Sequence, residues 1–157
     1  MPGLEDLYRE IILDHYRNPR NRGQLPVPPA HKVEGFNPLC GDEIVIYLDV
    51  EDGKVTDLRI DGQGCSISQS SASMMSAVVK GKTVDEARAM TRAFKAMMSI
   101  HESALDGDDG EVPEVDPNID LGDLEALRGV VKFPVRIKCA TLSWNTLTQG
   151  LDETAST

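Results

Sequence analysis

The first hydrophobic positions of the chain recur at the spacing of an amphipathic helix, with about 3.6 residues per turn. The pattern stops at Asn18-Pro19, because proline cannot continue a helix. We expect the apolar side of this helix to pack on a sheet. That side consists of Leu4, Leu7, Tyr8, Ile11 and Ile12.

Three segments that follow have the character of β-strands. In residues 44–50 the even-numbered positions are all aliphatic, which is typical of a strand with one buried face. Asp52-Gly53 predicts a tight turn into a strand at residues 55–60, and residues 31–36 predict an earlier strand. Because the connections are local, we expect the three strands to pair antiparallel.

The second half of the chain is predominantly helical in its pattern. Ser66 to Gln69 reads as a capping box that opens a helix over residues 66–80. Thr83 to Glu86 reads as a second capping box, and further helices are predicted around residues 121–128 and 135–150. The whole pattern predicts an α+β fold, a three-stranded antiparallel sheet packed with about five helices, as one domain over residues 1–157.

Charge and hydropathy narrow the possible partners and location. The formal net charge of −10 disfavours nucleic acid and anionic membranes, which attract basic surfaces. No apolar run approaches the roughly 20 residues that span a bilayer, and residues 1–6 do not resemble a signal peptide. We therefore expect a cytoplasmic protein, whose reducing surroundings keep thiols free.

An acidic segment interrupts the helical pattern. Nine acidic residues and no Lys or Arg lie between Asp106 and Glu125, and we predict an inserted loop at about residues 103–120. This composition favours a solvated loop, with a docking surface for a basic partner as the alternative. A calcium site at residues 106–110 is disfavoured, because the spacing of a calcium-binding loop is incomplete.

Three cysteines are the main candidates for chemistry: Cys40, Cys65 and Cys139. The odd number argues against a closed disulfide framework. Cys40 and Cys65 adjoin glycines, and Gly41 allows the backbone to kink so that the Asp42 carboxylate turns toward the same ion as Cys40. Three thiols and one carboxylate make a complete tetrahedral ligand set for zinc, and thiolates also hold iron-sulfur clusters.

The histidines are weaker candidates for the fourth ligand. None adjoins a cysteine, and each is expected to be structural or exposed: His15 in the first helix, His31 at the start of a strand and His101 at the end of a helix.

The cysteine segments resemble those of the U-type iron-sulfur cluster assembly proteins, the family of IscU, SufU and the N-terminal domain of NifU. The resemblance rests on Cys40-Gly41-Asp42, on Gly62 to Ser66 around Cys65, and on the basic-aliphatic run before Cys139. It begins at Tyr8 and the segment Asp14 to Asn21, and continues to about residue 151. It therefore covers nearly the whole chain and implies the SufE/NifU-like fold.

Two departures from the IscU pattern make the chain more similar to SufU. Lys138 stands where IscU-like chains carry a histidine, and Phe133 to Arg136 replaces their Leu-Pro-Pro-Val-Lys chaperone-recognition run. The acidic segment resembles an insertion of SufU-type members. The resemblance therefore does not imply a specialised recruiting chaperone as a partner.

The family resemblance implies a role in iron-sulfur cluster biogenesis, with Cys40, Asp42, Cys65 and Cys139 as ligands. Similarity to SufU implies a zinc-bearing protein that accepts sulfur from a pyridoxal-phosphate cysteine desulfurase, at most as its sulfurtransferase partner. Cys40 would be the persulfide acceptor, displaced from zinc by a desulfurase group, and Arg136 would stabilise the thiolate or persulfide.

Similarity to IscU implies instead a non-enzymatic scaffold. The same ligands would hold a transient [2Fe-2S] cluster that passes to apo iron-sulfur proteins or downstream carriers. Two other classes are weaker. A purely structural zinc domain usually shows paired C-x-x-C knuckles, which are absent from the sequence, and a hydrolytic zinc enzyme needs an open coordination position.

Overall fold

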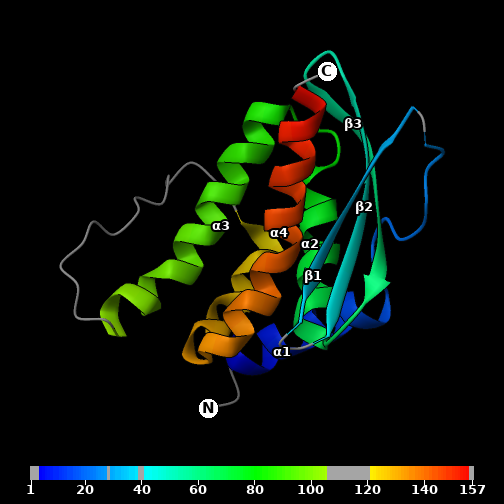
Figure 1. Ribbon diagram of the computed structural model, residues 1–157. Helices are drawn as coiled ribbons and strands as arrows, with labels where there is room; N and C mark the ends of the chain where they lie inside the picture. The colour runs from blue at the N-terminus through cyan, green and yellow to red at the C-terminus, as the bar shows by residue number, and fades with distance from the viewer. Residues whose placement is uncertain (1–3, 28, 39–40, 106–120, 156–157) are drawn as a thin grey trace.

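Three antiparallel strands in the order β1-β2-β3 form one layer of the molecule, and helices cover one of its faces (Figure 1). The strands are β1 at His31–Asn37, β2 at Asp42–Glu51 and β3 at Lys54–Gln63. The computed structural model describes residues 4–27, 29–38, 41–105 and 121–155. The predicted three-stranded antiparallel sheet is confirmed.

The alternation in β2 sets the buried face of the sheet. Ile44, Ile46 and Leu48 are buried on the helical side, as their spacing predicts. Asp42 belongs to the same alternating set and pairs with Asn37, the last residue of β1. The polar pair at this end of the sheet therefore continues the buried stripe.

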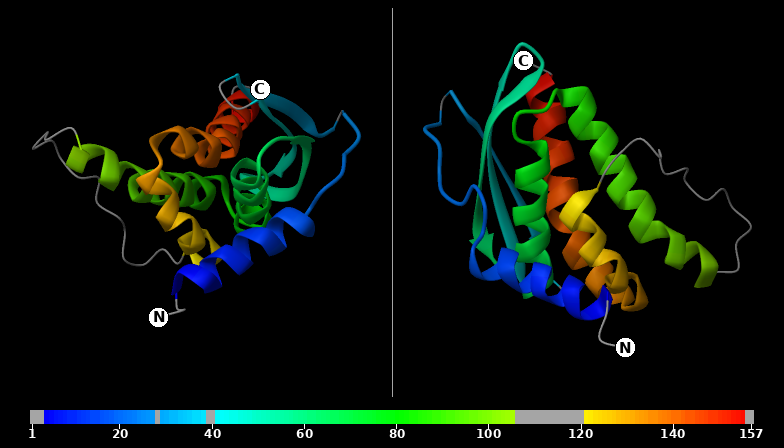
Figure 2. Two further views of the ribbon diagram at one scale, coloured as in Figure 1. Left: turned by 90° about the horizontal axis from the view of Figure 1, so that it is seen from below. Right: turned by 180° about the vertical axis from the view of Figure 1, so that it is seen from behind.

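Helices α2 (Ser66–Val79) and α4 (Pro134–Ala155) lie against the sheet, and α3 (Val84–Leu105) packs on their outer side (Figures 1 and 2). The Phe94 ring of α3 stacks on the Trp144 ring of α4, with centroids 4.9 Å apart. The Ser71 hydroxyl donates to the carbonyl oxygen of Ala140 over 2.6 Å and ties α2 to α4. These contacts fix the relative positions of the helix starts that form the site.

Helix α1 (Leu4–Arg17) crosses the lower end of the molecule and packs on α2 and on the 3₁₀ helix η1 (Gly122–Lys132), not on the sheet as the sequence predicted (Figure 2). Its buried His15 lies 2.8 Å from the Ser73 hydroxyl through Nδ1 and 2.8 Å from Asp123 through Nε2. The Arg20 backbone N–H also donates to Ser73, so the Ser73 hydroxyl can donate to Nδ1 while Nε2–H donates to Asp123. His15 therefore has a structural role, as expected.

Several boundaries differ from the sequence prediction. The Thr83 capping box is present, but η1 (Gly122–Lys132) is a 3₁₀ helix that extends beyond the predicted residues 121–128. Helix α3 runs to Leu105, so it includes residue 101 and the first residues assigned to the acidic loop. Residues 106–120 lie outside the described residues, together with the disfavoured calcium segment.

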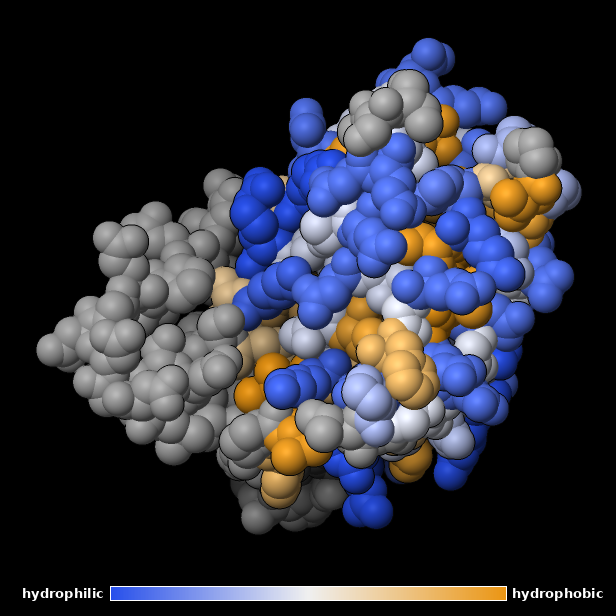
Figure 3. All heavy atoms as spheres, in the orientation of Figure 1, coloured by the Kyte–Doolittle hydropathy of each residue, from blue (hydrophilic) through white to orange (hydrophobic). Residues whose placement is uncertain are grey.

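His31 is the first residue of β1, as predicted, and its Nε2 lies 2.7 Å from Glu153. None of the described helices combines the length and apolar character that a membrane span requires. In the view of Figure 3, hydrophilic residues cover most of the surface, and hydrophobic residues appear between them and near the lower end.

Candidate metal centre

Three elements that are distant in sequence meet at one end of the sheet. Asp42 begins β2, Cys65 precedes α2, and Cys139 lies in the second turn of α4. One ligand atom from each of these three side chains lies within 4.8 Å of the other two. The structure thus brings together three of the four predicted ligands, whereas Cys40 lies outside the described residues.

Asp42 is turned into the protein rather than toward solvent. Gly41 has φ +68°, a left-handed conformation that glycine adopts without strain, so the kink expected from the sequence is present. The Asp42 side chain is 0% exposed. Its Oδ1 accepts the backbone N–H of Cys65 over 2.9 Å. A buried carboxylate of this kind requires compensating partners, which a metal ion would supply.

The hydrogen bonds around Asp42 keep its carboxyl group ionised. Burial raises the pKa of Asp42, but hydrogen bonds from the Cys65 backbone, from the thiols of Cys139 and Cys65, and from Ser68 together bring that pKa below its usual value. The oxygen ligand is therefore held as an anion.

Cys65 is the N-cap of α2. The backbone N–H of Ser68 donates to its Sγ over 3.5 Å, so the helix, which begins at Ser66 as predicted, is capped by the thiol and not by a Ser66 capping box. The positive end of a helix dipole favours an anionic sulfur at this position. The glycine before it is required sterically, because a Cβ at Gly64 would stand 2.5 Å from Asp42 Oδ1 and 2.6 Å from Ser68 Oγ.

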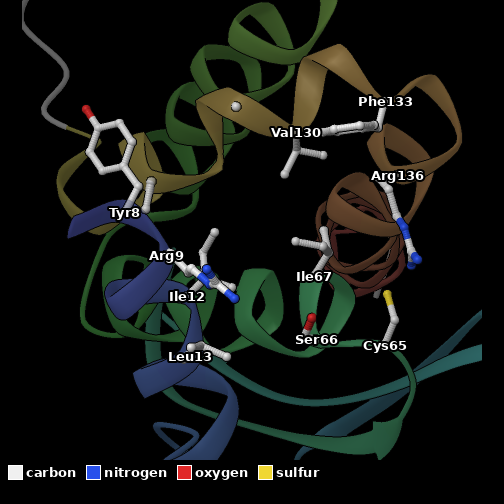
Figure 4. A pocket seen from close by; sticks show the side chains of 12 residues that line it. Tyr8, Arg9, Ile12, Leu13, Cys65, Ser66, Ile67, Val130, Phe133 and Arg136 are labelled. Atoms are coloured by element: carbon white, nitrogen blue, oxygen red, sulfur yellow. The ribbon is translucent and has the colours of Figure 1, made fainter. Parts of the chain in front are cut away.

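Arg136 faces the thiol side of the centre. Its guanidinium group points toward the Cys65 sulfur (Figure 4). The charge of Cys65, followed by hydrogen bonds to Cys139 and Cys65, raises the pKa of Arg136 above its usual value. Since such an interaction is reciprocal, the guanidinium stabilises negative charge on these sulfurs. The predicted position of Arg136 beside the thiols is therefore observed, while its chemical role stays a proposal.

Asn37 is a residue of the centre that the sequence analysis missed. It is 7% exposed, and its Nδ2 donates to Asp42 Oδ2 over 3.4 Å and to Cys139 Sγ over 3.8 Å. It thereby connects the carboxylate to a thiol on a different element. The signal was available, because Asn37 ends β1 and Asp42 begins β2, and the antiparallel register places the two residues opposite each other on the buried face.

We predict that Asn37→Ala lowers zinc affinity by about 10–100-fold, the usual cost of losing a residue that orients metal ligands. The matched control is Asn18→Ala, because Asn18 is exposed and follows α1. Competition with a chromophoric chelator measures the affinity, and the absorption spectrum of the Co²⁺-loaded protein reports ligand geometry. An Asn37→Ala protein with parental affinity and an unchanged Co²⁺ spectrum would contradict the positioning role.

The donor set suits zinc. Thiolate sulfur binds Zn²⁺ at about 2.3 Å and carboxylate oxygen at about 2.0–2.2 Å, so the ligands of a tetrahedral ion stand roughly 3.5–3.8 Å apart. The described ligand atoms, all within 4.8 Å of one another, need only modest side-chain adjustment to reach this geometry. Neither Cys65 nor Cys139 is in a disulfide, so both sulfurs can serve as metal ligands.

The three-stranded sheet and its helices form the fold of the NifU-like N-terminal domains. A model of that family matches residues 7–140, and the chain belongs to the family. Among its relatives, the zinc-dependent sulfurtransferase SufU of Bacillus subtilis is 46% identical over 148 residues, covering 94% of this chain and 91% of SufU. The resemblance proposed from the cysteine segments is thus confirmed.

Scaffold proteins are also among the relatives. The iron-sulfur cluster assembly scaffold protein IscU of Streptococcus pyogenes is 37% identical, with coverage of 98% of this chain and 87% of the relative. The crystal structure of a candidate scaffold protein for the SUF system from Fervidobacterium islandicum AW-1 superposes with a TM-score of 0.77. That protein is 35% identical, and the match covers 95% of this chain and 99% of the other.

Proposed function

We propose that this protein takes part in iron-sulfur cluster biogenesis as a zinc-bearing sulfur acceptor for a pyridoxal-phosphate cysteine desulfurase. The observation that carries the proposal is the cluster of buried Asp42, half-buried Cys65 and buried Cys139, whose ligand atoms lie close enough for one metal ion. The 46% identity to a protein named as a zinc-dependent sulfurtransferase supports this choice of metal and activity.

The four ligands in this proposal are Asp42, Cys65 and Cys139 together with Cys40, which stands two residues before Asp42 in the sequence. Bound zinc would keep the cysteine side chains as thiolates at neutral pH. Asp42 is already oriented for this role by the Cys65 backbone and by Asn37.

Sulfur transfer would proceed through Cys40. Its thiolate attacks the outer sulfur of the desulfurase persulfide, a new S–S bond forms on Cys40, and the desulfurase cysteine leaves as a thiolate. The sulfane sulfur moves without a net oxidation or reduction, so no further reactant is needed. Cys40 is the proposed acceptor because the resemblance to SufU implies this role, and because Cys40 adjoins Gly41, whose φ of +68° is a conformation that glycine adopts without strain.

Arg136 would stabilise the anions of this reaction. A site with three thiolates and one carboxylate carries more negative charge than one Zn²⁺ neutralises, and the arriving persulfide adds to it. The guanidinium faces the sulfur side of the centre, where it offsets part of this charge.

A scaffold function is the second candidate. Thiolates hold a [2Fe-2S] cluster, and a carboxylate is a more exchangeable ligand through which a cluster could be released to apo-proteins or carriers. The presence of Asp42 in the centre and the 37% identity to an IscU scaffold favour this candidate. In this case the cluster is the cargo of the protein.

We also propose that the chain is a single domain that works in the cytoplasm. Neither Cys65 nor Cys139 is in a disulfide, which is compatible with a reducing compartment. The acidic insertion is proposed to be a solvated segment without a catalytic role.

One reconstitution experiment separates the two functions. The purified protein is incubated anaerobically with iron, cysteine and a cysteine desulfurase, and zinc content, visible absorption and alanine formation are followed together. Sulfur transfer predicts that zinc is retained and alanine formation rises, without a stable chromophore. Zinc release with formation of a stable iron-sulfur chromophore would favour the scaffold.

A further inference from the structure

A pocket of about 880 Å³ lies directly beside the metal centre, and Cys65 forms part of its wall. Figure 4 shows Ile12 of α1, Ile67 of α2 and Val130 of η1 around its interior. Its size and apolar walls are typical of binding sites rather than of surface irregularities. An occupant of this pocket would lie against one of the proposed metal ligands.

The apolar surface continues beyond the rim of the pocket. Phe133 lines the pocket and is 61% exposed, and Val135, two residues later, is 58% exposed. Exposed aromatic and aliphatic side chains that adjoin a pocket are typical of protein interaction sites. The continuous surface favours a protein segment over a small free ligand.

Two arginines give this surface a charge opposite to that of the whole protein. Arg9 and Arg136 line the pocket, although the chain carries a net charge of −10. Arg9 is exposed and points toward the pocket interior in Figure 4. Among the described side chains, Arg9 forms no ion pair. A carboxylate on the occupant would therefore find a cation at the edge of an apolar cavity.

We infer that this pocket is the docking site for an apolar side chain with a neighbouring carboxylate on the sulfur donor protein. The apolar side chain would enter between Ile12, Ile67 and Val130, and the carboxylate would bind Arg9. This arrangement rests on the proposed function, and it deepens that function by specifying how the donor is held next to Cys65. Binding at this position brings the donor persulfide to the thiol side of the centre.

The chain offers a position in the pocket wall where a large side chain can be introduced. Gly129 lines the pocket, and a Cβ added there meets no heavy atom within 4 Å. We expect Gly129→Trp to weaken binding of a purified cysteine desulfurase to the zinc-loaded protein by at least about tenfold, as loss of a central contact does. Isothermal titration calorimetry measures the affinity, and zinc content shows that the metal centre is intact.

The charged contact is tested separately. Arg9→Glu is expected to weaken desulfurase binding by at least about tenfold, and Arg9→Lys by less than about threefold. Matched controls are Ala77→Trp, on an exposed part of α2, and Arg92→Glu, on an exposed part of α3. Both control proteins should bind the desulfurase as the parent does.

Different failures have different meanings. Parental binding by Gly129→Trp, or equal losses in Arg9→Glu and Arg92→Glu, would overturn the docking site while leaving the proposed function in place. A parent protein that neither binds nor activates the desulfurase would overturn the proposed function and the docking site with it. Self-association of the parent that disappears in Gly129→Trp would assign the pocket to a second copy of the chain and also overturn the inference.

Discussion

Replacing Cys139 with serine is expected to reduce zinc affinity more than a substitution of any residue that is not a proposed ligand. Cys139 is buried, and the Asn37 side chain donates to its sulfur. A solvent-exposed thiol therefore cannot take the place of a serine hydroxyl at this position. Serine is a far poorer ligand than thiolate, and the loss should exceed the roughly 10–100-fold cost of losing an orienting residue. Chelator competition with the purified variant measures this difference.

Cys65→Ser should behave similarly in the same assay, and Thr141→Ser is a suitable control for a polar change on α4. The Thr141 hydroxyl donates to the Ile137 carbonyl within the helix, outside the ligand set. Circular dichroism of each variant establishes that the fold persists. Parental zinc affinity in folded Cys65→Ser and Cys139→Ser proteins would show that the metal is bound elsewhere.

Cys40→Ser is expected to abolish stimulation of the desulfurase, because a hydroxyl cannot accept the sulfane sulfur. Arg136→Ala should reduce stimulation without abolishing it, since it removes one charge that favours the sulfur anions but leaves the acceptor thiol. Alanine formed per desulfurase over time is the measurement. The two variants together separate the acceptor from the residue that assists it.

Zinc content must be measured in the same samples, because Cys40 is also a proposed ligand. A Cys40→Ser protein that retains part of its zinc and gives no stimulation supports the acceptor role. Full stimulation by Cys40→Ser would exclude sulfur transfer through this thiol and leave the scaffold function as the better account.

The secondary structure and the position of Asp42 could be predicted because they follow from local patterns. The aliphatic alternation over residues 44–50 extends back to Asp42, which places its side chain on the buried face. Gly41 supplies the positive φ immediately before β2. Both features depend on neighbours in sequence, so one chain is enough to recognise them.

The connections inside the centre could not be predicted in the same way. Asn37 contacts Cys139 across 102 positions of sequence, and only the packing of α4 on the sheet brings them together. Helix α2 begins at Ser66 as predicted, but its cap is Cys65, because the thiol accepts the Ser68 N–H, a cap that the usual oxygen-based patterns do not include. Tertiary packing and an unusual cap therefore account for what the sequence analysis missed.

The same distinction applies to the pocket beside Cys65. Its walls come from α1, α2, η1 and the start of α4, and the sequence predicted each of these helices separately. The amphipathic pattern shows that a helix has a buried side but not which element covers it. Because α1 was predicted to pack on the sheet, the pocket could not be predicted. The buried hydrogen bonds of His15 to Ser73 and Asp123 identify the elements that cover α1 as α2 and η1.

The position of the transferred sulfur tests the central claim most directly. The zinc-loaded protein is mixed with a desulfurase and cysteine for a single turnover, the thiols are alkylated, and peptides are analysed by mass spectrometry for one added sulfur atom. Our account predicts the added sulfur on the peptide containing Cys40, with zinc still bound to the protein. Sulfur on Cys65 or Cys139, or desulfurase turnover without any persulfide on this chain, would contradict it.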